Sequence, residues 1–216
     1  MARSGAPARP RLLVATRSPH KLAELRELLA VDRAELVTLD DLGVEGDVDE
    51  TGMTFEANAG LKARFGARAT GLPTLADDSG LEVAALGGGP GVRTRRYAGE
   101  SATDADNNSK LLAALAGLPP EDRGARYVCV LALALPDDAG PRGGMPIRVV
   151  RGTCRGRIAL EPRGSGGFGY DPIFEPESEP PGGRTLGLWT AQEKNRISHR
   201  GAAARRMTPI LRELGF

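Results

Sequence analysis

Short apolar runs along the chain alternate with segments in which apolar residues recur every three or four positions. Residues 11–16, RLLVAT, form the first run, which is typical of a short buried strand. The helix after it is predicted to have Ser18 as its cap and Pro19 in its first position. Its apolar stripe consists of Leu22, Leu25, Leu28 and Leu29.

Further elements follow from the same reading. The stretch 125–135 is apolar on both faces and predicts a central strand, which pairs with 147–158 across a Pro/Gly-rich turn at 136–146. Other strands are predicted at 35–39, 74–77 and 81–85, with a glycine-rich loop at 87–91, and helices at 53–69, 104–116 and 200–214. Strands that alternate with helices favour an α/β layer fold, and the hairpin makes its sheet mixed.

Composition favours one globular domain. The 216 residues are 40% apolar and 26% charged, which is enough for a core in a single domain spanning 11–216. Residues 1–10 are predicted to be a disordered tail. With no run of about 18 apolar residues, we expect no membrane span. Cys129 and Cys154 match no metal or redox spacing, so two reduced thiols and a cytoplasmic location are expected.

The net charge of +1 provides no global field for nucleic acid, so nucleic-acid binding is disfavoured and any phosphate must be bound by a local basic cluster. Most of the 29 basic residues are arginine. A lysine in such a chain can mark a place where a compact charge is needed. The four lysines are Lys21, Lys62, Lys110 and Lys194.

Thr16, Arg17 and Ser18 are predicted at a helix N-terminus, where free amides and the helix dipole favour an anion. Lys21 in the first turn is unfavourable there unless a phosphate binds, although it can also be a solvated lysine. On the next helix, Lys62 lies four residues after Asn58 on an apolar face. A ligand is one explanation for this pair, and a snorkelling lysine is the other.

Acidic residues form a second candidate group. Asp77-Asp78-Ser79 is predicted at a strand end, where α/β folds place ligands. Adjacent carboxylates suit Mg²⁺, or one of them can act as a general base, and Glu50 is a further acid before the second helix. A solvated turn is the competing interpretation.

The segment 164–169 formally matches GxGxxG, but no helix pattern follows it, so we reject a dinucleotide site. It presents Phe168 and Tyr170 beside Asp171 on a flexible loop, where an aromatic ring can stack on a base or anchor the loop. Residues 194–200, KNRISHR, place many donors just ahead of the last helix.

Five segments in order along the chain resemble the inosine triphosphate pyrophosphatase family, also called the Ham1-like family. They are LLVATRSPHKLAEL, ETGMTFEANAGLKA, ADDSGLEVAALGGGPGVRTRRYAGE, GSGGFGYDPIF and EKNRISHRG. Five collinear blocks are far more specific than one motif.

The resemblance implies an elongated mixed α/β sheet with two lobes and a cleft between them, in a homodimer. It implies Mg²⁺-dependent hydrolysis of inosine, deoxyinosine and xanthosine triphosphates to the monophosphate and pyrophosphate. Asp78 corresponds to the proton acceptor and a metal contact, with Glu50 and Asp77 as further metal carboxylates. Thr16, Arg17, Ser18, Lys21, Lys62 and Ser79 correspond to phosphate contacts, and Phe168, Gly169, Tyr170, Asp171, Lys194, His199 and Arg200 to the base pocket.

The chain departs from the family pattern at two places. Thr16-Arg17-Ser18 replaces the usual Thr-Gly-Asn, which makes Ser18 the weakest of the phosphate predictions. Leu186-Gly187-Leu188 lacks the acid of the usual Ala-Glu-Leu element. Two other functions compete: a Maf-like pyrophosphatase for modified pyrimidine nucleotides, and a non-catalytic nucleotide sensor.

Overall fold

A computed structural model describes residues 9–136 and 145–216. The predicted tail at 1–10 and the predicted turn at 136–146 lie mostly outside these residues. Six strands form one sheet in the order β2-β1-β3-β4-β5-β6. The strands are β1 (Arg11–Val14), β2 (Glu35–Thr38), β3 (Thr74–Val83), β4 (Gly124–Ala134), β5 (Ile147–Ile158) and β6 (Phe174–Pro176). β1 runs parallel to β2 and β3, and the remaining pairs are antiparallel, so the predicted mixed sheet is confirmed.

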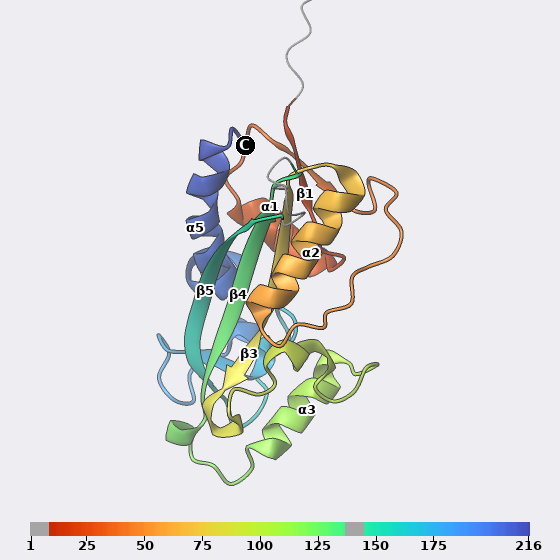
Figure 1. The fold of residues 1–216 in the computed structure, drawn as a ribbon. Coiled ribbons are helices and arrows are strands. Elements are labelled where there is room, and N and C mark those ends of the chain that lie inside the picture. Colours follow the sequence, from red (N-terminus) through yellow and green to blue (C-terminus); the bar gives the residue numbers. More distant parts are fainter. Residues whose placement is uncertain (1–8, 137–144) are drawn as a thin grey trace, which may run out of the picture.

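Five α-helices surround the sheet in the described part of the chain. They are α1 (Pro19–Leu28), α2 (Phe55–Thr70), α3 (Asp104–Ala114), α4 (Ala191–Ile197) and α5 (His199–Glu213). Short 3-10 helices are η1 (Ala84–Leu86), η2 (Gly91–Arg96), η3 (Pro120–Asp122), η5 (Asp171–Ile173) and η6 (Leu186–Leu188). The molecule is elongated, with α1, α2 and α5 around the upper part of the sheet and α3 at the lower end (Figure 1). None of the described helices combines the length and the apolar character that a membrane crossing requires.

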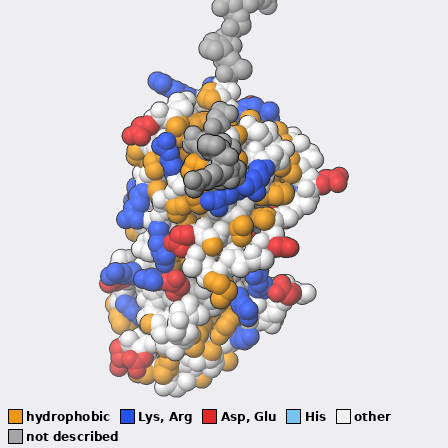
Figure 2. Space-filling model, in the orientation of Figure 1, with side chains coloured by type: hydrophobic (Ala, Val, Ile, Leu, Met, Phe, Trp, Pro, Cys, Tyr) orange, Lys and Arg blue, Asp and Glu red, His pale blue; other side chains and the backbone are white. Residues whose placement is uncertain are grey.

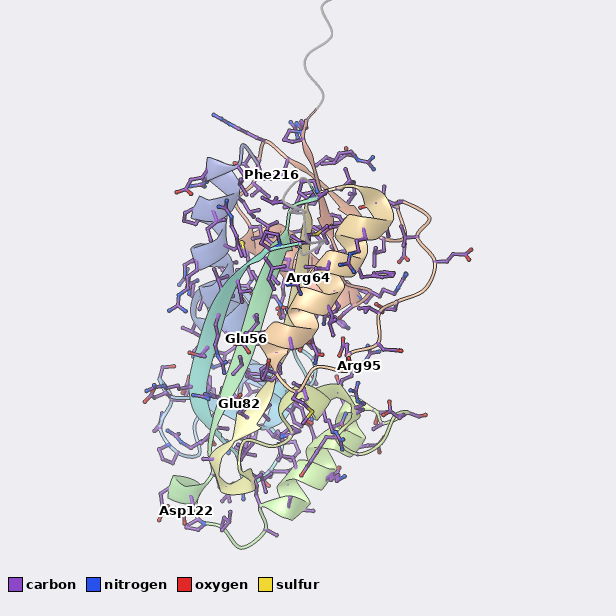
Figure 3. The ribbon with its side chains drawn as sticks, viewed as in Figure 1. Glu56, Arg64, Glu82, Arg95, Asp122 and Phe216 are labelled. Carbon is purple, nitrogen blue, oxygen red and sulfur yellow. The ribbon has the colours of Figure 1, made fainter. Side chains whose placement is uncertain are left out.

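Alternation along the strands builds two apolar layers. Leu12 and Val14 of β1 pack with α1 and α5 on one face, whereas Leu13 packs with α2 on the other. A third cluster at the lower end contains Leu111 of α3 and Phe174 of β6. Across the α2 face, Arg151 pairs with Glu56 of α2 at 2.9 Å and with Glu82 of β3 at 3.5 Å; Figure 3 labels both acids.

The helix starts follow the sequence signals. Ser18 caps α1, with Pro19 in its first position, as predicted. Thr54 caps α2, and Gly71 ends that helix in the left-handed conformation at φ 66°. Helix α4 was not predicted, although Thr190 and Glu193 form a capping box that signals it.

The prediction of two short strands separated by a loop at 77–80 is wrong. β3 is one continuous strand, because β4 pairs with it along its whole length from Thr74↔Ala134 to Val83↔Ala125. Gly80 lies so close to η2 that an added Cβ would be 2.6 Å from the Gly91 carbonyl oxygen. The acidic residues therefore lie within a strand rather than at its end.

One edge of β3 is left open at this point. The register of β1 with β3 ends at Val14↔Leu75, whereas β3 continues to Val83. Farther along, the Leu81 N–H donates to Thr94 Oγ1 of η2 at 2.8 Å. Between these two points Asp77 to Gly80 pair on this side with no strand in the described part of the chain. We call this stretch, residues 77–80, the notch.

Candidate active site

Asp77 extends from the notch toward α1 and α5. Its carboxylate lies 2.5 Å from Lys21 Nζ and accepts from Arg200 Nε at 3.0 Å and from Cys129 Sγ at 3.0 Å. Burial alone would raise the pKa of Asp77, but the Arg200 and Lys21 charges hold it well below its usual value. Asp77 is therefore a buried anion bound by two cations.

Asp78 extends to the opposite face, toward α2. Lys62 Nζ donates to Asp78 Oδ1 at 2.8 Å and to Glu50 Oε1 at 3.0 Å. Burial raises the pKa of Asp78, and the neighbouring Lys62 charge offsets part of that rise. Burial opposes the charge on Lys62, yet Asp78 and Glu50 together raise its pKa. An anion at Asp78 with a raised pKa is a stronger base than an exposed aspartate.

The sequence predicted that Glu50, Asp77 and Asp78 form one metal site, and the structure does not bring all three together. Successive side chains of a strand point to opposite faces, so Asp78 joins Glu50 while Asp77 joins Arg200. Within 9–136 and 145–216, no cluster of three His, Cys, Asp or Glu side chains is arranged to bind a metal.

Arg200 and Lys194 connect the Asp77 side to α1. Arg200 is completely buried; it donates to Ser79 Oγ at 2.9 Å and also to Glu24. Lys194 Nζ donates to the other Glu24 oxygen at 3.0 Å and to Asp171 Oδ2 at 2.7 Å. Glu24 therefore pairs with both Lys194 and Arg200, two cations predicted for the base pocket. Glu24 itself was not among the site residues predicted from the sequence. The available signal was its position one helical turn after Lys21.

Lys21 and Lys194 thus belong to the ion pairs on the Asp77 side, and Lys62 belongs to those on the Asp78 side. We call the two groups together the network. Lys110 instead donates to the Tyr97 carbonyl oxygen at 2.6 Å. Ion pairs flank the notch on both faces of β3. A cavity of about 600 Å³ lies elsewhere, lined by residues such as Glu82, Arg126 and Arg157, and includes none of the predicted site residues.

Comparisons with protein families, related sequences and solved structures agree with the family resemblance seen in the sequence. The Ham1 family model matches residues 12–210. The chain belongs to the Ham1 family. It is 48% identical to a dITP/XTP pyrophosphatase of Streptomyces coelicolor, over 94% of this chain and 98% of that protein. A dITP/XTP pyrophosphatase of Yersinia pseudotuberculosis is 47% identical, with the same shares covered.

Solved Ham1 structures share the fold. A HAM1 protein from Coxiella burnetii superimposes with a TM-score of 0.83 at 44% identity, over 94% of this chain and 99% of that one. The Staphylococcus aureus Ham1 protein gives a TM-score of 0.81 at 36% identity, with the same coverage. The elongated mixed sheet predicted from the resemblance is confirmed.

The predicted base residues of this Ham1 chain come together around Phe168. The Phe168 ring stacks on His20 of α1 with centroids 5.2 Å apart, and Lys194 Nζ lies 4.4 Å from the ring centre. Asp171 accepts from the Phe168 N–H at 3.0 Å and from the Tyr127 hydroxyl at 3.3 Å. Neither His20 nor Tyr127 was predicted, because only the folded chain places them beside this loop.

His199 lies beneath this group. Its ring stacks on the Tyr127 ring, with the ring centroids 4.7 Å apart and an angle of 9° between the ring planes, and only 5% of the residue is exposed. Nδ1 is buried without a hydrogen-bond partner among the described residues. Burial, followed by the nearby Arg200 and Lys194 charges, holds the pKa of His199 well below its usual value, so the ring is neutral.

The three residues ahead of α1 differ in their contacts. Ser18 Oγ accepts from the Lys21 N–H at 3.5 Å, and Thr16 Oγ1 accepts from the Ser18 N–H at 3.3 Å. The helix start that they form places Lys21 against Asp77 of the notch. Arg17 instead extends over the loop at 40–47, where it pairs with Asp40 and donates to the Val44 carbonyl oxygen at 3.0 Å.

Proposed function

We propose that this chain hydrolyses non-canonical purine nucleoside triphosphates, such as ITP, dITP and XTP, to the monophosphate and pyrophosphate. The observation that carries the proposal is the network at the notch. Acids and cations from four parts of the chain meet there, and relatives that align with 94% of the chain are dITP/XTP pyrophosphatases.

Asp78 is the proposed proton acceptor for the attacking water. Its carboxylate is buried, its pKa is raised by that burial, and Lys62 fixes one oxygen. The second oxygen remains for a water molecule. Lys62 and Lys21 are the proposed partners of the departing pyrophosphate, since Lys62 Nζ has a third N–H beside the two that its carboxylates use, and Lys21 can exchange Asp77 for a phosphate oxygen.

Mg²⁺ is the proposed cofactor, and the donor set fits it. Glu50 and Asp78 share Lys62 on one face and supply hard oxygen donors; Mg²⁺ in phosphate sites is commonly bound by one or two carboxylates plus substrate oxygens. When bound, the ion would offset charge that develops on the phosphates. Asp77 is the least suited of the three predicted carboxylates, because Arg200 and Lys21 already neutralise it.

The charge balance of the network also favours a divalent cation. Four cations, Lys21, Lys62, Lys194 and Arg200, face five carboxylates, Glu24, Glu50, Asp77, Asp78 and Asp171. Four positive charges minus five negative ones leave a net charge of −1. A triphosphate would therefore meet excess negative charge unless a metal ion accompanied it.

Base recognition is assigned to the Phe168–Asp171 loop with Lys194, His199 and Arg200. Three of the five guanidinium N–H groups of Arg200 are used by Asp77, Ser79 and Glu24, which leaves two. A remaining N–H donates to a purine 6-oxo group once the bound base displaces side chains that cover Arg200, whereas adenine presents an amino group there. Such a mismatch leaves a buried donor unpaired and is strongly disfavoured. Thr16, Ser18 and Ser79 are the proposed hydroxyl contacts to phosphate, and Arg17 reaches phosphate only if it leaves the 40–47 loop.

We also propose a cytoplasmic homodimer. Two free thiols, Cys129 and Cys154, are consistent with a reducing compartment, and the dimer rests on the family resemblance. Acidic and basic side chains are interspersed on the face shown in Figure 2. The mass in solution, measured by light scattering, tests the dimer.

A substrate panel tests the function. Pyrophosphate release is measured from ITP, dITP, XTP, ATP and a modified uridine triphosphate, with Mg²⁺ and with chelator. We expect fast release from the first three, only with Mg²⁺. Preference for the uridine nucleotide would favour the Maf-like alternative, and tight binding without turnover would favour a sensor; the comparisons support neither.

A further inference from the structure

Each residue of the loop at 168–171 is anchored to a different part of the molecule. Phe168 stacks on His20 of α1, and the Tyr170 hydroxyl donates to the Thr94 carbonyl oxygen of η2 at 2.8 Å. Asp171 accepts from Lys194 of α4. The remaining residue, Gly169, is bound by α3, which belongs to the lower end of the molecule and contributes nothing to the ion-pair network at the notch.

Two side chains of α3 bind both backbone polar groups of Gly169. The Gly169 N–H donates to Asp104 Oδ2 at 2.6 Å, and its carbonyl oxygen accepts from Asn108 Nδ2 at 3.1 Å. Asp104 and Asn108 are four residues apart and so lie on the same side of the helix. Asn108 is buried, with 7% of its surface exposed. Its amide orientation follows from chemistry, since a carbonyl oxygen only accepts and must face the NH₂ group.

The loop needs this external support. Gly169 and the three glycines that precede the loop, Gly164, Gly166 and Gly167, give it little intrinsic rigidity, and Gly169 has a φ of 62° that favours glycine. A loop that samples several conformations pays an ordering entropy when a ligand binds it. Contacts that hold Gly169 in place remove that cost for a base stacked on Phe168.

We propose that Asp104 and Asn108 are positioning residues that set the base-stacking loop and thereby the affinity for the purine, without acting on the phosphates. This inference rests on the proposed function of the loop as the base site. It makes the lower end of the molecule a determinant of substrate affinity, although none of its side chains joins the network around Asp77 and Asp78.

Asn108→Asp is the decisive variant. It preserves the shape of the side chain but turns an acceptor toward the Gly169 carbonyl oxygen. We expect the KM for ITP to rise by about fivefold to tenfold, as for the loss of one hydrogen bond, with a smaller change in kcat. The inhibition constant of imidodiphosphate, which lacks a base, should not change. Asp104→Ala, at an exposed position, should raise KM in the same direction and provides a second variant if Asn108→Asp fails to fold.

Asp106→Ala is the matched control. Asp106 belongs to the same helical turn and completes the capping box with Thr103, but it does not touch Gly169. This variant should melt at a lower temperature and keep the wild-type KM. Equal KM values for Asn108→Asp, Asp104→Ala and Asp106→Ala would contradict the inference, as would a parallel rise in the imidodiphosphate constant.

A binding measurement separates this inference from the proposed function. Calorimetric titration with inosine monophosphate is carried out on the same variants. Weaker binding of inosine monophosphate by Asn108→Asp than by Asp106→Ala supports the inference. It does so even if the wild-type protein releases no pyrophosphate from ITP, because the absence of pyrophosphate release would overturn only the proposed hydrolysis. Identical binding by both variants overturns the inference.

Discussion

Replacement of Arg200 by methionine tests whether the buried network holds the fold together. Arg200 has no exposed surface, and its three nitrogens donate to Asp77, Glu24 and Ser79. Arg200→Met fills similar volume but leaves Asp77 with only Lys21 as a cationic partner. Removing one partner of a buried ion pair costs about 3–5 kcal/mol, and we expect the lower end because Lys21 remains.

A loss of about 3 kcal/mol corresponds to a decrease in melting temperature of roughly 6–12 °C for a chain of this length. Scanning calorimetry and urea unfolding measure it. Adding Asp77→Asn to Arg200→Met should cost less than the sum of the two single changes, because the second change removes the buried charge that has lost its Arg200 partner.

The exposed Arg184, which pairs with Glu179 and Glu193, provides the control. Arg184→Met should leave the melting temperature within the error of the measurement. A decrease for Arg200→Met no larger than that of Arg184→Met would refute the reasoning, since it would mean that the network contributes nothing to folding.

Three further predictions address other parts of the site. His199 has a pKa well below that of an unfolded histidine, so its contribution to stability is complete above about pH 6.5 and is lost as the pH falls toward the folded pKa. His199→Phe should therefore weaken the dependence of the melting temperature on pH between about pH 6.5 and 5, and an unchanged slope of melting temperature against pH would contradict this. Gly152→Ala should destabilise by about 1–3 kcal/mol in urea unfolding, because its Cβ would lie 2.3 Å from the Ala203 backbone nitrogen of α5; wild-type stability would show that α5 is not held this closely. Glu50→Gln should raise the Mg²⁺ concentration for half-maximal rate by at least about tenfold, since even the loss of a side chain that only supports a metal ligand typically costs about 10- to 100-fold; an unchanged requirement would remove Glu50 from the metal site.

Local signals predicted most elements of the fold. Ser18 and Pro19 fixed the start of α1, and Gly71 fixed the end of α2, because caps and breakers act within a few residues. The continuity of β3 could not be predicted this way, since it depends on pairing with β4 about 50 residues away. Polar residues such as Asp77 are typical of loops unless distant cations neutralise them.

The same distinction applies to the site. Lys21, Lys62 and Lys194 were identified from the sequence, because isolated lysines stand out in an arginine-rich chain and lie in blocks that resemble a known family. Asp77 and Asp78 point to opposite faces because they lie within a strand, where successive side chains alternate. The sequence placed them in a loop, so this alternation was not expected. Glu24 and Cys129 reach the network only through tertiary contacts of α1 and β4.

Pyrophosphate release from ITP by Asp78→Asn, compared with the wild-type protein, tests the central claim most directly. Asparagine preserves the shape of the side chain and a contact to Lys62 but cannot accept a proton. Loss of general base catalysis predicts a rate reduced by at least about 10²- to 10⁴-fold, with a folded protein that still binds the nucleotide. A variant that hydrolyses ITP at a rate near that of the wild type would contradict the account, because the notch would then hold no base.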